Sequence, residues 1–205
     1  MRGFSFCYFC GINFFRDNPT KYEERPMDKK EMMITLAKKG VIVIDGDTEP
    51  KMAYAVQDAL NIARASGHEE LHIQITSNGG RVDIGLDIYD LIRLYPARQR
   101  IGTVLGFARS MGAVILQACD HRKCARHAKV LIHYVSTSSV ALDAMKDKKR
   151  LNLAIARGEQ DQQALDRILA HKTGKTIQEI RRVCAKDTDM NAEEALKFGL
   201  IDEII

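Results

Sequence analysis

The amino-acid sequence predicts an α/β domain built around a sheet of parallel strands. Short apolar runs alternate with amphipathic helical segments three times between residues 40 and 135. These runs are apolar enough to be covered by helices on both sides, as strands of parallel sheets usually are. The chain has 205 residues, of which 45% are hydrophobic and 28% charged, so it can bury one core of its own.

Each predicted element has a local signal. Residues 40–46, "GVIVIDG", are a β-branched run that stops at Asp-Gly, which indicates a buried strand. Residues 49–67 carry apolar side chains at three- and four-residue steps before a terminal glycine, which predicts an amphipathic helix. The strand "LHIQIT" at 71–76 leads through a glycine turn into a helical pattern at 84–95. Further strands are expected at 100–106 and 128–135, and further helices at 110–119, 141–172 and 176–185.

The domain is expected to span residues 36–205, after a tail and linker at residues 1–35. Residues 16–35 contain two prolines and many charges, a composition typical of linkers. Residues 141–172, within a region of about 136–172, form a helical pattern with few apolar positions. A helix too polar to belong to the core predicts a projection that packs partly against another chain.

Composition and charge narrow the functional class. The formal net charge is +4, but 31 basic residues are interspersed with 27 acidic ones, so we expect no nucleic-acid partner. No window is apolar enough to predict a membrane span, and the N-terminus lacks the features of a signal peptide. Five scattered cysteines favour a reducing, cytoplasmic compartment over a disulfide framework. Cys7 and Cys10 form a C-x-x-C without nearby further ligands, so no metal site is expected.

Ser110, in "TVLGFARSMGA" (103–113), is the strongest candidate for a nucleophile. It lies where an expected parallel strand passes into a helix, and unpaired backbone N–H groups gather at such helix starts. A serine that attacks a carbonyl needs such donors for the developing oxyanion, and the N–H groups of Gly79 and Met111 are candidates. The alternative is that Ser110 simply caps the helix. Gly79 and Gly80 lie in "TSNGGRVDIG", which matches neither phosphate-loop pattern.

A nucleophilic serine also needs a base and a carboxylate to orient it. His133 closes the apolar run "AKVLIH", at what should be the same sheet edge as Ser110, although a histidine at a strand end is often only structural. Asp187 and Asp189 in "KDTDM" are both candidate carboxylates. They point the same way in an extended chain, so periodicity does not choose between them.

Over residues 36–205 these stretches resemble the proteolytic subunit of Clp protease. The family's double glycine before a helix is similar to "SNGGRVDIGLDIYD", and its nucleophile motif to "GFARSMG". Its histidine strand is similar to "AKVLIH", and its closing segment to Asp187 followed by "EEALKFGLID". The chain departs from the family pattern in "YVSTSSV" after His133, where a glycine-rich strand is common, in a longer handle, in its N-terminal 35 residues and at two positions near the site. Asn78 replaces the usual proline, and Arg109 replaces a usual small residue.

The resemblance implies a fold, an activity and a set of site residues. The fold would be a crotonase-like α/β spiral with a protruding handle helix. The activity would be that of a serine endopeptidase that acts through an acyl-enzyme. The implied catalytic residues are Ser110, His133 and Asp187, the implied oxyanion-hole donors are Gly79 and Met111, and the implied substrate-binding residues are Gly80 and Arg81.

The resemblance also implies an assembly. Members of the family form stacked rings of seven identical subunits that enclose the peptidase sites. A partner AAA+ unfoldase uses ATP to feed unfolded polypeptides into the chamber, and the peptidase site itself needs no metal or organic cofactor. The alternatives are a non-catalytic scaffold subunit, a prophage-type protease that matures capsids, and an acyl-CoA hydratase or isomerase of the related fold.

Overall fold

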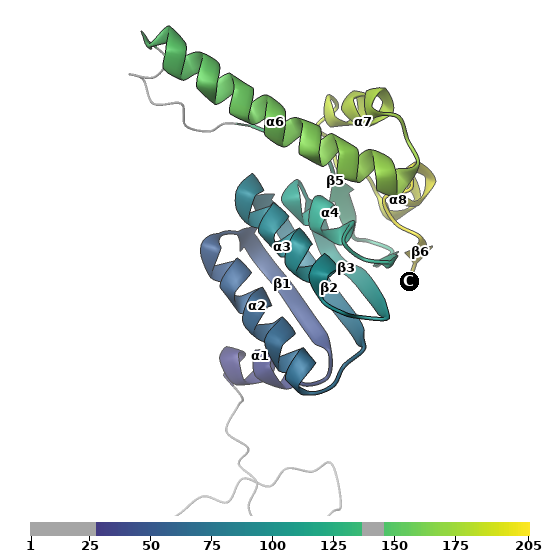
Figure 1. Ribbon diagram of the computed structural model, residues 1–205. Helices are drawn as coiled ribbons and strands as arrows, with labels where there is room; N and C mark the ends of the chain where they lie inside the picture. Colours follow the sequence, from purple (N-terminus) through teal and green to yellow (C-terminus); the bar gives the residue numbers. More distant parts are fainter. Residues whose placement is uncertain (1–27, 137–145) are drawn as a thin grey trace, which may run out of the picture.

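The computed structural model describes residues 28–136 and 146–205 as an α/β domain with one long projecting helix (Figure 1). The six-stranded sheet has the order β1-β2-β3-β4-β6, with β5 also paired to β3. Every strand pair is parallel, as the alternation of strands and helices predicts. The strands are β1 (Val41–Thr48), β2 (Glu70–Gly80), β3 (Gln99–Arg109), β4 (His121–Cys124), β5 (Lys129–Leu131) and β6 (Glu203–Ile204). The helices are α1 (Lys29–Ala37), α2 (Pro50–Ala65), α3 (Val82–Leu94), α4 (Met111–Leu116), α6 (Lys148–Thr173), α7 (Ile177–Cys184) and α8 (Ala192–Phe198).

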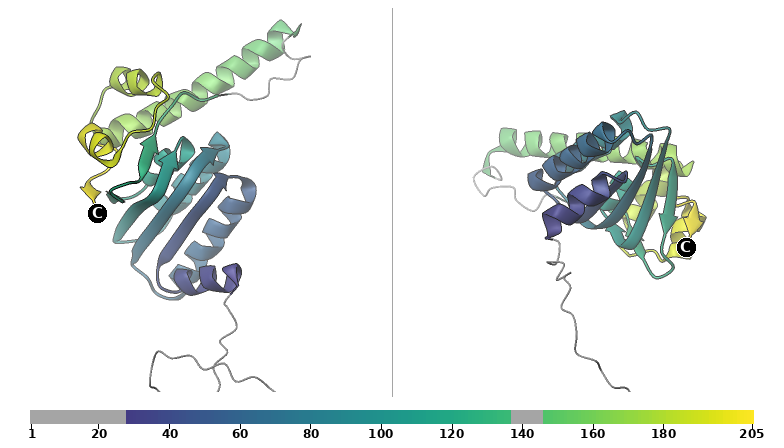
Figure 2. Two further views of the ribbon diagram at one scale, coloured as in Figure 1. Left: turned by 180° about the vertical axis from the view of Figure 1, so that it is seen from behind. Right: turned by 90° about the horizontal axis from the view of Figure 1, so that it is seen from below.

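Helices α2, α3 and α4 cover one face of the sheet, and the view from behind shows the strands of the opposite face in front (Figure 2). Burial alternates along the strands accordingly. Ile73 and Ile75 of β2 are fully buried, whereas His72 between them is exposed. In the described part of the chain, these three helices therefore cover one face of the central strands, and the opposite face is more exposed. The alternating apolar and polar residues of "LHIQIT" are the signal of a half-buried strand.

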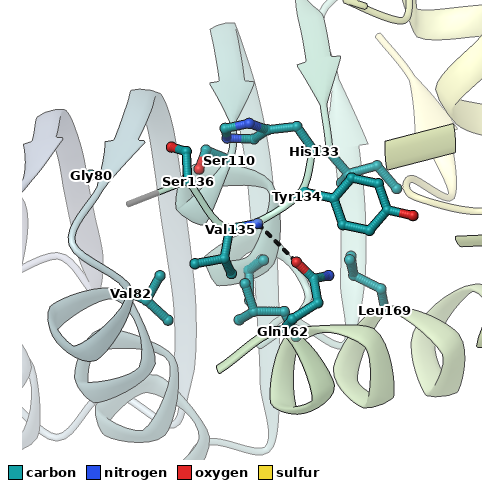
Figure 3. A pocket seen from close by; sticks show the side chains of 12 residues that line it. Gly80, Val82, Ser110, His133, Tyr134, Val135, Ser136, Gln162 and Leu169 are labelled. Carbon is teal, nitrogen blue, oxygen red and sulfur yellow. Dashed lines mark hydrogen bonds between the residues drawn. The ribbon is translucent and has the colours of Figure 1, made fainter. Parts of the chain in front are cut away.

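The double glycine belongs to the strand rather than to a turn. After a register shift in both pairings, β2 continues to its end, where Gly79 pairs with Asp47 and Gly80 with Thr48 of β1. The segment expected to be a strand at 128–135 is shorter in the structure, because β5 ends at Leu131. His133 therefore follows the strand by two residues instead of closing it. It remains at the carboxyl edge of the sheet (Figure 3).

The short strands β4 and β6 were not predicted from the sequence, and a buried arginine connects them. Arg122 of β4 donates hydrogen bonds through its side chain to Asp202, Gln117 Oε1 and Gly199 O. Its backbone N–H also donates to Asp202, at 2.8 Å. These contacts fix the C-terminal residues beside β4, where Cys124 pairs with Ile204 of β6.

Helix α6 is the projecting helix. Its only buried residues are Leu165, Asp166 and Leu169, all in its C-terminal half, and the rest extends beyond the body of the domain (Figure 1). Leu153 and Ile155 are exposed on the extended half. The helix agrees with the predicted projection, although residues 137–145 of that region lie outside the described residues.

Helix α1 lies inside the stretch expected to be a linker. Asp28 accepts a hydrogen bond from the Glu31 N–H, and the Glu31 side chain accepts one from the Asp28 N–H. This capping box starts a helix whose last residue, Ala37, is in the core. Among the described residues the domain therefore begins at α1 and not at residue 36. The D-x-x-E spacing of Asp28 and Glu31 was the sequence signal for this helix start.

No helix in residues 28–136 and 146–205 is long and apolar enough to cross a membrane.

Candidate active site

Ser110 alone forms the turn between β3 and α4. Strand β3 ends at Arg109 and α4 begins at Met111, so the chain reverses its course at one residue. The Ser110 backbone has φ 51° and ψ −121°, a conformation that costs a non-glycine residue about 1–3 kcal/mol. Its N–H donates to Leu131 O at 2.9 Å, which ties the turn to the end of β5. A strained strand-to-helix turn of this kind presents a nucleophilic side chain at the edge of an α/β sheet.

The hydroxyl of Ser110 stabilises no described element of the fold through a hydrogen bond. It does not cap α4, although Ser110 occupies the N-cap position. It forms no hydrogen bond with any described residue, and the side chain lines a pocket (Figure 3). The capping alternative is therefore wrong, and the hydroxyl is available to a ligand.

The end of β2 packs directly against the Ser110 turn. A Cβ placed on Gly79 would lie 2.6 Å from Ser110 Cβ and 2.8 Å from the Met111 nitrogen, so only glycine fits there. This contact brings the backbone of Gly79 beside the first N–H of α4. No described residue accepts a hydrogen bond from the Met111 N–H. The Gly79 N–H donates to Ser77 Oγ at 3.1 Å, a long bond that an oxyanion would have to share or replace.

His133 lines the same pocket, and Asp187 lies close to His133. The distance from His133 Nδ1 to Asp187 Oδ1 is 3.7 Å, which is longer than a hydrogen bond. The His133 side chain is 26% exposed and the Asp187 side chain 71% exposed. Asp187 has φ 45°, a left-handed conformation that aspartate tolerates better than most residues. A small movement of the exposed carboxylate would close the bond.

Asp189 binds a different partner from Asp187. Both of its carboxylate oxygens bind Arg109, at 2.7 Å from Nε and 2.6 Å from Nη2. These charge-assisted bonds hold the pKa of the Asp189 carboxyl below its usual range. The structure thus separates two aspartates that the sequence pattern could not distinguish. Asp187 faces the histidine, and Asp189 pairs with the arginine.

The pocket beside Ser110 is small and has a lining that is part polar and part apolar. Its volume is about 40 Å³, and Figure 3 shows Ser110 and His133 on one side of it. Gln162 of α6 closes another side and accepts a hydrogen bond from the Val135 N–H at 2.8 Å. Sequence reasoning missed Gln162, because nothing in its local pattern distinguishes it from other polar positions of the helix. The apolar lining comprises Val82, Val114, Ile132, Val135, Leu165 and Leu169.

Of the two residues expected to bind substrate, the structure brings only one to the pocket. Gly80 lines it, and a Cβ there would lie 2.7 Å from Thr48 Oγ1. Arg81 is not among the lining residues. Its backbone N–H donates to Thr48 O at 3.0 Å, and its side chain pairs with Asp83. Pairing with a substrate strand through the Arg81 N–H would require the bond to Thr48 to break.

The three described cysteines are poor nucleophiles. Burial raises the pKa of Cys119 to about 12 and the pKa values of Cys124 and Cys184 to about 11. A raised pKa keeps each thiol protonated at about pH 8, and only the thiolate reacts readily. We expect iodoacetamide at about pH 8 to leave all three unmodified in the folded protein and to alkylate them in urea. Peptide mass spectrometry measures this, and rapid native alkylation of Cys119 would contradict it. Cys7 and Cys10 lie outside the described residues.

In the described ranges no three histidine, cysteine or acidic side chains gather as metal ligands. The polar groups that do gather are a strained serine, a histidine, a nearby carboxylate and two backbone N–H groups.

A protein-family model described as Clp protease matches residues 24–205, which is most of the chain. The chain therefore belongs to the Clp protease family.

Proposed function

We propose that this protein is a serine endopeptidase that uses Ser110, His133 and Asp187. The observation that carries the proposal is the Ser110 turn. Its backbone is strained, its hydroxyl bonds to no described residue, and it shares a pocket with His133. Membership in the Clp protease family supports a peptidase over the acyl-CoA hydratase alternative.

The proposed reaction follows serine-peptidase chemistry. Ser110 Oγ attacks the carbonyl carbon of the scissile peptide bond, while His133 Nε2 takes the hydroxyl proton. Asp187 faces the other ring nitrogen and stabilises the imidazolium. The N–H groups of Gly79 and Met111 bind the oxyanion. His133 then gives the proton to the leaving amine. In the second half-reaction His133 takes a proton from water, the resulting hydroxide attacks the acyl carbon, and the bond to Ser110 Oγ breaks as His133 returns the proton to that oxygen. This chemistry requires no metal or organic cofactor.

The pocket suggests which residue precedes the cleaved bond. Its small volume and the aliphatic side chains on part of its wall suit a small apolar side chain next to the reacting carbonyl. Gly80, which lines the pocket, offers backbone groups to an extended substrate. Binding through main-chain hydrogen bonds depends little on the substrate's side chains, so many sequences are tolerated. The proposed substrates are therefore unfolded polypeptides.

The proposed assembly is a closed homo-oligomer of stacked seven-membered rings, fed by an AAA+ unfoldase that uses ATP. Exposed apolar residues on the projecting helix support self-association. Tyr134, Leu151 and Ile155 line an apolar groove along α6. Apolar surface of this kind marks protein contacts. Buried free cysteines fit a reducing cytoplasm.

One observation favours a second candidate, a catalytically silent subunit. The 3.7 Å between His133 and Asp187 leaves the described form without the hydrogen bond that orients the base. A subunit held in this form would build the chamber without cleaving substrate.

A fluorophosphonate distinguishes the two candidates, because it reacts only with an activated serine. We expect one adduct per chain by intact mass, located by peptide mapping on the peptide that contains Ser110. His133→Gln is expected to slow the reaction strongly, since the base is lost. An unlabelled protein would reject the peptidase proposal and support the silent subunit, whereas an adduct on another serine would reject Ser110 as the nucleophile.

A further inference from the structure

Arg109 connects the two sides of the candidate active site. It is the last residue of β3, directly before Ser110. Its guanidinium binds Asp189 through Nε and Nη2 and donates from Nη1 to Asn78 Oδ1 at 3.1 Å. Asn78 directly precedes Gly79, whose backbone abuts the Ser110 turn. One side chain thus contacts both the strand that carries an oxyanion-hole candidate and the loop that carries Asp187.

The guanidinium is held in place before any substrate arrives. Its Cζ lies 4.8 Å from the centre of the Phe107 ring, two residues earlier on β3. The strand beneath is paired on both sides, with Ala108 opposite Ser77 of β2 and Arg109 opposite Leu131 of β5. A planar group stacked on a ring and bound at both ends has little freedom left. The Arg109 bonds lower the pKa of Asp189, so this carboxylate stays ionised to a lower pH than a free aspartate.

The loop that carries Asp187 has few other attachments. Before it, the Asp187 N–H donates to Cys184 O at the end of α7, at a long 3.2 Å. After it, Met190 exchanges two backbone hydrogen bonds with Val130. Between these points, the side chain of Thr188 bonds within the loop, to Lys186 O. Asp187 approaches His133 without a hydrogen bond. Among the described residues, the one side-chain hydrogen bond from the loop to another part of the domain is that of Asp189 to Arg109. The Arg109 contact therefore adds a side-chain attachment to the backbone bonds at the two ends of the loop and limits how far the loop can move from His133.

We propose that Arg109 is a positioning residue that, through Asp189 and Asn78, aligns the Asp187 loop and the Gly79 strand about Ser110. It touches no reacting atom. Its bonds to Asp189 and Asn78 occupy three of its five N–H donors, which argues against Arg109 as the binding site for an acidic substrate side chain. The part of the proposal that concerns catalysis rests on the proposed serine-peptidase function.

The first test is a double-mutant cycle of Arg109→Ala, Asp189→Ala and the double variant. The readouts are the rate constant for fluorophosphonate labelling of Ser110, and kcat and KM for a short peptide substrate. Each single variant is expected to lower the labelling rate and kcat by roughly 10- to 100-fold, the scale of a misplacement of about 1 Å, with KM nearly unchanged. The double variant should match Arg109→Ala within about twofold, because Arg109→Ala alone already removes the bonds to both Asp189 and Asn78. Multiplying effects in the double variant, or a rise in KM alone, would overturn the proposal.

Two matched variants separate positioning from charge and from general destabilisation. Arg109→Lys keeps the charge but cannot form the two-pronged bond, so it should restore only part of the rate. Full activity in Arg109→Lys would reject the geometric role. Arg93→Ala removes a similarly exposed arginine that pairs with Asp120, on the last turn of α3, and should leave labelling at the wild-type rate.

Hydrogen exchange tests the positioning role without reference to catalysis. In Arg109→Ala, the amides of residues 186–190 are expected to exchange at least about threefold faster, while those of the buried strand centres stay unchanged. Unchanged exchange in this loop would overturn the inference even if the labelling rate falls. If wild-type Ser110 takes no label at all, the proposed peptidase function fails, and the exchange measurement still decides whether Arg109 holds the loop.

Discussion

Replacing Ser110 with alanine is expected to abolish peptide hydrolysis while leaving the fold intact. Removing the nucleophile of a serine peptidase lowers kcat by at least about 10⁴-fold, because no other group supplies the acyl-enzyme path. The measurement is steady-state hydrolysis of a short peptide ester or amide by purified wild-type and variant protein. Residual hydrolysis near the wild-type rate would place the nucleophile elsewhere.

The stability of Ser110→Ala is the second half of this prediction. The hydroxyl bonds to no described residue, and alanine keeps the Cβ of the turn, so the free energy of unfolding should change by less than about 0.5 kcal/mol. A serine that capped α4 would cost about 0.5–2 kcal/mol on replacement. If Ser110→Ala lowers the free energy of unfolding by about 0.5–2 kcal/mol as well as the activity, Ser110 has a structural role. Loss of activity alone identifies a chemical one.

The positions of β1, β2 and β3 and of Ser110 were predictable, because their signals are local. A β-branched run, a periodic helix and a serine between glycines can each be recognised within a few residues. The short strands could not be recognised in this way. Strand β6 has two residues and β4 has four, too few to show a period, and a buried arginine that bonds across the chain joins them. Those contacts exist only after folding.

The choice between the two aspartates shows the same limit at the site itself. Asp187 and Asp189 lie in one short segment with the same orientation in an extended chain, so no local pattern separates them. The structure separates them through Arg109, which is 80 residues from Asp189 in sequence. Arg109 and Asn78 were both visible as departures from the family pattern. Only the fold shows that Arg109 bonds both to Asn78 and to the loop that carries Asp187.

Replacing Gly79 with alanine is expected to disable the site through the backbone. The added Cβ would lie 2.6 Å from Ser110 Cβ and 2.8 Å from both Arg109 O and the Met111 nitrogen. Two of these three neighbours are backbone atoms, so the strand and the turn must move apart. That movement separates the two N–H groups proposed to bind the oxyanion. Since losing one such donor costs about 10²–10³ in kcat, we expect fluorophosphonate labelling of Ser110 to slow at least about 100-fold.

Gly46→Ala is the matched control, because it carries the same kind of backbone strain without the clash. Gly46 has φ 106°, close to the 90° of Gly79, but no atom lies within 4 Å of its added Cβ. Both variants therefore lose about 1 kcal/mol of stability to the positive φ, whereas only Gly79→Ala disturbs the site. Equal labelling rates in the two variants would show that the close contact at Gly79 serves packing alone. A slow Gly79→Ala beside a normal Gly46→Ala would assign the contact to the oxyanion hole.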